Sequence, residues 1–293
     1  MLKIIKILYL LVNSVIIIAL LSIHFVLKES SYQNSLLFYT FPLPVIIAIV
    51  LCLTIFLSKT FRKYNLLLAG ALLLFWLGRS FKIHIPEEIN ESDIEIVFWN
   101  ASHERNLEDA FDISGNIPDV FVLVEHGKYS VDRLQLKYSD YYFYKSINGI
   151  SIFSKLPIEL IDDISSNYGT NIVKFETYNI NFYAVDVSGS MDVPREWELT
   201  FVNEYVEQKT QTILLGDFNV PFESKFLDSI KNNFNHAFNE KGNGFRETWF
   251  WNIPLLSLDH IWVSKDLEVL KTEKIGTFKS DHNMLKTVIK KTE

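Results

Sequence analysis

The stretch Thr212-Ile-Leu-Leu-Gly-Asp-Phe-Asn219 is an apolar run that ends in a short polar cluster. An apolar run of this length predicts a buried strand, and polar residues directly after it are typical of a strand end that faces a pocket. A lone aspartate at a strand end is more often a turn or cap residue than a catalyst. Whether Asp217 belongs to a site therefore depends on the rest of the chain.

Similar pieces occur in four other places, each with a polar residue where an apolar run begins or ends. Singly, each has a structural explanation, because Asn100 could form a turn, Glu125 could be a solvated strand end and Asp259 could cap a helix. Together they favour one phosphoesterase site. The pieces are Ile94-Glu-Ile-Val-Phe-Trp-Asn100, Asp119-Val-Phe-Val-Leu-Val-Glu125, Leu258-Asp259-His260-Ile261 and Ser280-Asp281-His282.

With Gly149-Ile-Ser-Ile-Phe-Ser-Lys155 and Thr248-Trp249, these pieces resemble in order the elements of the endonuclease/exonuclease/phosphatase superfamily. That superfamily includes abasic-site endonucleases, secreted DNases, inositol-phosphate phosphatases and sphingomyelinases. The resemblance extends from about Ile94 to Ile289. It implies an α/β fold, a four-layer sandwich of two packed β-sheets flanked by helices, with the site at one end of the sheets.

The resemblance implies that a hard divalent cation, Mg²⁺ or Mn²⁺, neutralises the phosphoryl oxygens. Glu125 would hold this metal, Asn100 would position it and Asp281 would complete the shell on the metal side. A carboxylate is a suitable oxygen ligand for Mg²⁺, which keeps several waters and takes few protein ligands.

The remaining roles concern water and phosphate. By the same resemblance, Asp217 would orient or deprotonate the attacking water, and Asn219 would hold the phosphate or steady Asp217. His282 would contact the scissile phosphate, and Asp259 would accept its other ring proton and fix the tautomer. His260 would point to the opposite side of an extended strand from Asp259, so we interpret it as a packing or surface residue.

One position departs from the family pattern. Where most of the family's hydrolases have a histidine before the Gly-Asp-x-Asn element, this chain has Asp186. An ionised carboxylate repels a phosphate unless a cation lies between them. Asp186 could be an extra metal ligand, or a carboxylic acid whose pKa is raised by neighbouring carboxylates so that it donates a proton. It could equally mark a weakened or lost activity.

The first third of the chain is different in kind. Three apolar stretches, Ile4 to Leu27, Leu36 to Ser58 and Asn65 to Phe81, predict three transmembrane helices. We therefore expect a membrane region over residues 1–82, a linker over 83–93 and the catalytic domain over 94–293. The only cysteine, Cys52, lies in the second stretch, so the catalytic domain has no disulfide.

Lysine and arginine in the short loops predict the orientation. They gather at the N-terminus and between the second and third stretches, whereas Lys28 stands beside Glu29 in the other loop. This places the N-terminus in the cytoplasm and, after three crossings, the catalytic domain outside it. The expected location is a bacterial inner or plasma membrane.

Charge bears on the substrate. After Ile85 lie 20 of the 28 lysines and arginines and 34 of the 35 acidic residues, a formal net charge of −14. An acidic surface disfavours nucleic acid, which is bound through basic residues that displace counterions. A small phosphoester or a lipid head group is favoured instead. The alternatives are a nuclease acting on DNA outside the cytoplasm, and a pseudoenzyme that binds a phosphorylated ligand without cleaving it.

Hydrophobic periodicity predicts alternating strands and helices along the catalytic domain. The expected helices are Asn106 to Ile113, Val193 to Gln208 and Ser224 to Asn233. The expected strands are Ile94 to Phe98, Val120 to Val124, Tyr141 to Tyr144, Ile150 to Phe153, Ile172 to Phe175, Phe182 to Val185, Thr212 to Leu215, His260 to Val263 and Leu285 to Ile289.

Overall fold

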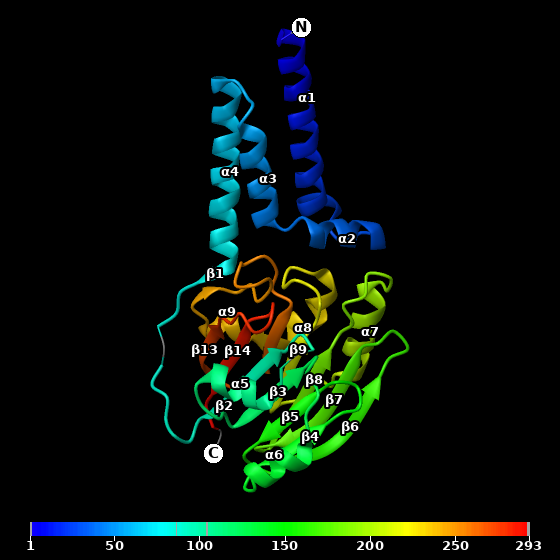
Figure 1. The fold of residues 1–293 in the computed structure, drawn as a ribbon, viewed down its shortest axis with the longest axis vertical. Helices are drawn as coiled ribbons and strands as arrows, with labels where there is room; N and C mark the ends of the chain where they lie inside the picture. The colour runs from blue at the N-terminus through cyan, green and yellow to red at the C-terminus, as the bar shows by residue number, and fades with distance from the viewer. Residues whose placement is uncertain (1, 86, 104, 292–293) are drawn as a thin grey trace. The chain divides into compact units, whose positions relative to one another are not determined.

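The computed structural model describes residues 2–85, 87–103 and 105–291. The chain divides into two compact units, Met1–Phe81 and Lys82–Glu293. Figure 1 shows the first as helices alone and the second as two β-sheets with helices on their faces.

The N-terminal unit has four α-helices, and by length and composition one helical span within its described residues could cross a membrane. This span is Lys3–Leu27, which comprises α1 and a π-helical turn, η1. A signal sequence or a core helix has the same character, so the span is weak evidence for an anchor. The elements are α1 (Leu2–Leu21), η1 (Ser22–Leu27), α2 (Tyr32–Thr40), α3 (Leu43–Thr54) and α4 (Lys59–Ser80).

The expectation of three membrane helices is therefore wrong. The second apolar stretch is broken into α2 and α3, which are bent by 66° and count as a span only if taken as a pair. The break falls at Phe41-Pro42, because proline lacks an N–H and disfavours helical backbone in the residue before it. Helix α4 is long enough, but Arg62, Lys63 and Arg79 lie within it and reduce its apolar character.

The C-terminal unit contains two mixed six-stranded sheets. The first has the strand order β13-β14-β2-β3-β5-β4 and the second β10-β12-β9-β8-β7-β6. The first comprises β2 (Ile94–Asn100), β3 (Val120–Val124), β4 (Tyr142–Lys145), β5 (Ser151–Ser154), β13 (Val269–Ile275) and β14 (Met284–Ile289). The second comprises β6 (Glu159–Ser165), β7 (Asn171–Thr177), β8 (Ile180–Asp186), β9 (Thr212–Asp217), β10 (Phe234–His236) and β12 (Asp259–Ser264).

Alternation along the central strands explains how the sheets pack. Phe98 and Val122 of the first sheet and Leu215 and Ile261 of the second belong to one buried cluster between the sheets. In β2 and β3, the residues that alternate with those facing the second sheet form another cluster with α5 and α6, on the outer face of the first sheet. The result is two packed mixed sheets flanked by helices.

The remaining elements are short. Helix α5 begins with a capping box between Asn106 and Asp109 and ends at Gly115, whose φ of 79° is left-handed. These elements are α5 (Leu107–Ser114), α6 (Val131–Lys137), α7 (Arg195–Tyr205), η2 (Lys225–Leu227), α8 (Asp228–Asn233), α9 (Ala237–Lys241), β1 (Phe81–Lys82) and β11 (Gly244–Phe245).

Strand direction places the polar strand ends together. Strands β2 and β3 are parallel, as are β8 and β9, so their carboxyl ends meet at the same edge of each sheet. Strand β12 is antiparallel to β9, so its first residue, Asp259, pairs with the last residue of β9, Asp217. Gly216 permits the close approach of β8, since a Cβ there would lie 2.0 Å from the Val185 carbonyl oxygen.

Candidate active site

Three aspartates stand side by side across the second sheet. Asp186 of β8 is in register with Asp217 of β9, which is in register with Asp259 of β12. Residues in register on neighbouring strands project from the same face. The sheet therefore concentrates negative charge at its edge, and Asp217 and Asp259 are each 1% exposed.

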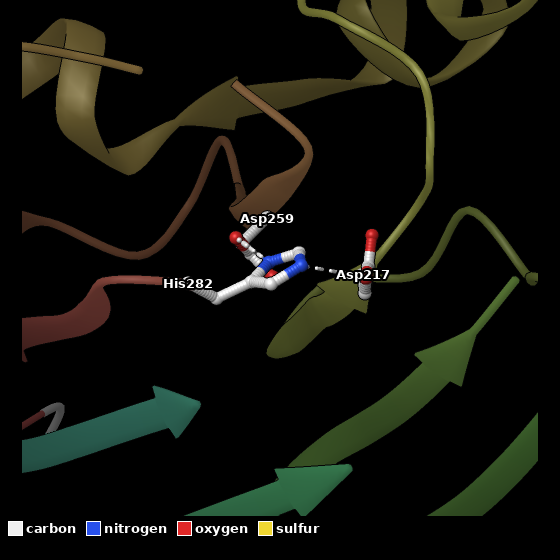
Figure 2. A group of neighbouring side chains, drawn as sticks. All are labelled: Asp217, Asp259 and His282. Carbon is white, nitrogen blue, oxygen red and sulfur yellow. Dashed lines mark hydrogen bonds and ion pairs between the residues drawn. The ribbon is translucent and has the colours of Figure 1, made fainter. Parts of the chain in front are cut away.

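His282, which lies just before β14, reaches this row. Its Nδ1 lies 2.8 Å from Asp259 Oδ2, and its Nε2 lies 4.0 Å from Asp217 Oδ2. Figure 2 shows the imidazole between the two carboxylates. Burial opposes a charge on His282, but Asp259 and Asp217 outweigh it and raise its pKa to about 10. The imidazole is therefore cationic at neutral pH.

The backbone at His282 is fixed from both sides. Ser280 Oγ accepts from the His282 amide at 3.0 Å and donates to the Asn100 carbonyl at 2.8 Å. The indole of Trp99 donates to the His282 carbonyl at 3.1 Å. These contacts join the Ser-Asp-His piece to β2, 180 residues away in sequence.

Asp217 is held by Asn100, whose Nδ2 donates to Asp217 Oδ2 at 2.9 Å. The Asp217 side chain also accepts from the Asn219 amide at 2.8 Å. Burial and the nearby Asp259 carboxylate raise the pKa of Asp217 to about 7, with His282 acting in the opposite direction. A carboxyl group with a pKa near 7 can exchange a proton with water at neutral pH.

Asn219 lies in left-handed backbone with a φ of 49°. Its Nδ2 donates to the Val187 carbonyl at 2.6 Å, and its own carbonyl accepts from Arg195 Nε at 3.2 Å. Positive φ at a non-glycine residue is strained and often marks functional sites. The loop after β9 is thus tied to the end of β8 and to the start of α7.

Glu125, which follows β3, is on the open side of the site. Its φ is 48°, and its side chain is 25% exposed. Its Oε2 lies 3.2 Å from Nε2 of His103, a residue that is 78% exposed. Ser102 and His103 also have positive φ, at 48° and 63°. The Glu125 carboxylate is reachable from solvent, unlike Asp217 and Asp259.

Asp281 is held by neighbours on both oxygens. Oδ1 accepts from the Ser102 hydroxyl and Oδ2 accepts from Trp249 Nε1 at 2.9 Å. Burial opposes its ionisation, but these two hydrogen bonds outweigh burial and hold its pKa below the usual value. The structure therefore places Asp281 beside the Asn100 loop, next to the predicted metal residues.

Asp186 is partly buried at the end of β8. Burial, and then the carboxylates of Asp217 and Glu125, raise its pKa well above the usual value, against a hydrogen bond from Asn171. In the second sheet, Asp186 is in register with Asp217.

The donor atoms fit a divalent cation. Asp217, Asp259 and His282 offer ligand atoms within 4.8 Å of one another, and Asp259 Oδ1 is buried without a hydrogen-bond partner among the described residues. This group differs from the predicted metal set of Glu125, Asn100 and Asp281. Among the described residues, the group that could hold a metal is therefore Asp217, Asp259 and His282, and the metal roles of Glu125, Asn100 and Asp281 remain predictions.

Some residues of the site were not found from the sequence. Ser102 and His103 lie two and three residues after the end of β2, and the polar residues after that strand were their only local signal. Thr248, which accepts from the amides of Leu258 and Asp259 at 3.2 Å each, was quoted only as part of the resemblance. His126 lies against Tyr129, with ring centroids 5.1 Å apart.

Comparisons with known proteins agree with the fold. The model of the Endonuclease/Exonuclease/phosphatase family matches residues 97–282. A member of this family from Bacteroides vulgatus has a similar structure, with a TM-score of 0.51 and 17% identity over 69% of this chain and 100% of that one. No curated protein sequence matches the chain.

Two other similar structures carry more specific names. A mannosyl-6-phosphatase from Bacteroides thetaiotaomicron has a TM-score of 0.53 and 14% identity, over 67% of this chain and 99% of that one. A 3′ phosphatase from Neisseria, bound to a product DNA hairpin, has a TM-score of 0.51 and 17% identity, over 66% of this chain and 98% of that one. At these identities the likeness shows the fold.

The fold and the carboxylate–histidine site define a class, the metal-dependent phosphoric ester hydrolases. The family model matches more than half of the chain, and the chain therefore belongs to the endonuclease/exonuclease/phosphatase family.

Proposed function

We propose that this chain is a membrane-anchored phosphoesterase that uses Mg²⁺ or Mn²⁺ to hydrolyse a small phosphoester or a lipid head group outside the cytoplasm. The observation that carries the catalytic part is His282, with Asp259 2.8 Å from one ring nitrogen and Asp217 4.0 Å from the other. Such an arrangement suits a group that contacts a phosphate through Nε2 while Asp259 holds the ring.

In this proposal the buried residues manage water and protons. Asp217 orients or deprotonates the attacking water. Asn219 steadies Asp217 through the 2.8 Å hydrogen bond that the Asn219 backbone N–H donates. His282 contributes positive charge toward the phosphate. Asp186 donates a proton to the leaving oxygen, since burial and the carboxylates of Asp217 and Glu125 raise its pKa.

The bound metal would neutralise charge on the phosphoryl oxygens. We assign it to Glu125 and Asn100, with Asp281 on the same side. The argument is the chemistry of the donors: Mg²⁺ prefers oxygen ligands and keeps several waters, and the partly exposed Glu125 leaves room for them. The buried group includes the imidazole of His282, a ligand that suits softer metals than Mg²⁺, so it is the poorer site for a hard cation.

The substrate follows from charge and attachment. A formal net charge of −14 after Ile85 disfavours a polyanion such as DNA. Among the similar structures, one acts on a sugar phosphate by its name and another is bound to DNA, so the fold serves both. We therefore place small phosphoesters and lipid head groups ahead of nucleic acid.

The anchor we propose is the span Lys3–Leu27. Many of its large apolar side chains are exposed, including Ile4 at 71%, Val15 at 65% and Ile18 at 64%. Exposed apolar residues around a helix of this length suit lipid surroundings. Lys3 and Lys6 at the start of the span, against Lys28 beside Glu29 after it, favour a cytoplasmic N-terminus. A single crossing would then put the catalytic unit on the other side of a bacterial inner or plasma membrane.

Hydrolysis of bis(p-nitrophenyl) phosphate by the full chain in detergent, with and without Mg²⁺ or Mn²⁺, tests the catalytic part. Metal-dependent turnover that is lost in His282→Ala supports it. A screen of phosphocholine-containing vesicles against single-stranded and duplex DNA then separates the substrate classes. If the parent chain and His282→Ala both hydrolyse the ester only at a background rate that metal does not raise, while the parent still binds phosphate, the result would support a pseudoenzyme, the alternative to which Asp186 points.

A further inference from the structure

Of the two roles expected for His260, packing or surface, its burial agrees with packing. It is 0% exposed, and its neighbour across the sheet, His236, is 5% exposed. Strand β12 projects Asp259 and Ile261 toward the inter-sheet side and His260 toward the opposite face, where His236 also lies. A buried histidine pair is costly unless its nitrogens are hydrogen-bonded.

The pair forms one continuous hydrogen-bonded chain. The Asn239 amide lies 3.3 Å from His236 Nδ1, His236 Nε2 lies 3.0 Å from His260 Nδ1, and His260 Nε2 lies 3.2 Å from the Val220 carbonyl oxygen. Val220 belongs to the loop that follows Asp217 and Asn219. The chain of hydrogen bonds therefore connects α9 and β12 to the loop that follows Asp217 and carries Asn219.

The two ends of this chain require the same proton arrangement. The Asn239 amide can only donate, so His236 Nδ1 accepts and its Nε2 carries the proton. The Val220 carbonyl can only accept, so His260 Nε2 carries a proton and its Nδ1 accepts from His236. Two neutral imidazoles satisfy every bond, and a proton added to either would place two donors face to face.

Aromatic packing fixes the same loop beyond Val220. The ring of Phe222 stacks on Trp262 with centroids 5.8 Å apart, and its amide donates to Ser257 Oγ at 3.0 Å. The guanidinium of Arg246 lies 4.1 Å from the Phe222 ring centroid. The loop is thus held against β12 at two successive points, by His260 and by Trp262.

We infer that His260, supported by His236, is a positioning residue that fixes the loop after Asp217, which carries Asn219, through the Val220 carbonyl. The inference rests on the proposed function only for its effect on turnover. One strand then serves both parts of the site, since Asp259 on one face of β12 orients His282 and His260 on the other face holds this loop. Neither His236 nor His260 contacts Asp217 or His282 in any hydrogen bond or ion pair that the described residues form.

Two substitutions separate positioning from packing. In His260→Gln the side-chain amide nitrogen can reach the position of Nε2 and still donate to the Val220 carbonyl. In His260→Asn the shorter side chain reaches only the position of Nδ1, so the bond to the loop is lost while polarity and burial are nearly kept. Leu134→Ala, on the outer face of the other sheet, controls for lost stability, since it truncates a side chain that is 5% exposed.

The experiment is hydrogen exchange of the full chain, followed by kcat and KM on bis(p-nitrophenyl) phosphate. In His260→Asn we expect exchange of the segment 217–222 to rise by about tenfold, with exchange of β3 unchanged, and kcat to fall by about tenfold with KM nearly constant. His260→Gln should restore both to within about threefold of the parent. Leu134→Ala should not raise exchange of the segment 217–222 relative to β3, and it should not lower kcat at constant KM.

The inference is overturned if His260→Asn exchanges and turns over like the parent, or if His260→Gln is as impaired as His260→Asn. Failure of the proposed function gives a different result, because the parent chain itself would then not turn over the substrate. In that case exchange of the segment 217–222 still decides whether His260 positions the loop.

Discussion

The two halves of the site differ in how firmly they are held. Asp217, Asp259 and His282 are buried and joined to one another and to Asn100, whereas Glu125 is partly exposed, sits in strained backbone and faces an exposed histidine. Preorganised polar groups in a dry setting stabilise charge that develops during a reaction. An accessible carboxylate suits a cation that retains water. The difference suggests a division of labour between a buried half and an open half.

Removal of His282 should have the largest effect, because it takes the only histidine from the buried half. His282→Ala is expected to lower kcat by about 10⁴-fold at saturating metal. The measurement is steady-state hydrolysis of bis(p-nitrophenyl) phosphate. The matched control is His84→Ala, a histidine that bonds the Gly242 carbonyl rather than a candidate site residue, and a similar loss there would contradict the assignment.

Asp259→Asn should come next, with a loss in kcat of about 10³-fold. The asparagine would keep the shape of the side chain but not the charge that raises the pKa of His282 to about 10. The imidazolium should therefore lose its proton at a lower pH, and activity in the variant should decline at a correspondingly lower pH. A pH–rate profile shifted toward higher pH would show that Asp259 does not support the charge on His282.

Glu125→Gln tests the open half. The substitution removes the charge but keeps an oxygen, so we expect about a 10²-fold loss at limiting Mg²⁺ that is partly recovered at high Mg²⁺. Titration of activity against metal concentration measures it. An unchanged metal requirement would place the cation elsewhere, and the group of Asp217, Asp259 and His282 would become the preferred site.

Asp186→Asn probes the strand end beside Asp217. If Asp186 protonates the leaving oxygen, kcat should fall by about tenfold on an ester with a poor leaving group and hardly at all on p-nitrophenyl esters. Comparison of an alkyl with a p-nitrophenyl phosphodiester measures this difference. Equal losses on both esters would favour the alternative of an extra metal ligand.

The smallest expected effect concerns stability in acid. Burial lowers the pKa of His260 to about 4, with Arg246 acting in the same direction and Val220, Asp259 and Glu223 opposing it. Between pH 6.5 and 4 the unfolded chain binds a proton that the folded chain does not. The unfolding free energy should therefore fall as pH drops through this window, by about 3 kcal/mol.

His260→Gln should lack this component, since glutamine does not titrate. Urea unfolding of both proteins at neutral pH and near the lower end of the window gives the comparison. A parent chain that loses no more stability than His260→Gln would mean that His260 is protonated in the folded state.

Most of the site could be predicted because each element leaves a local mark. A strand that begins or ends at a pocket has a polar residue there, and this signal, together with the family resemblance, pointed to Asn100, Glu125, Asp217, Asp259 and His282. The central strands were found for the same reason, since β3 is uniformly buried and reads as a continuous apolar run. The metal and catalytic roles of these five residues remain predictions.

Other parts of the fold carry no such mark. Strands β6 and β13 lie at the ends of their sheets, and β6 is largely exposed along Glu159–Ser165, so its polar sequence reads as a loop. The His236–His260 contact joins residues 24 apart in sequence, and no pattern in the sequence links them. Three membrane helices were predicted because the second stretch is apolar throughout, and hydropathy does not show that Pro42 breaks its helix.

Calorimetric titration of the full chain with Mg²⁺ tests the division of labour most directly, without any substrate. The account predicts that the parent chain and His282→Ala bind Mg²⁺ with similar affinity, whereas Glu125→Gln binds at least about tenfold more weakly. Loss of Mg²⁺ binding in His282→Ala with normal binding in Glu125→Gln would contradict it, and would place the metal among Asp217, Asp259 and His282.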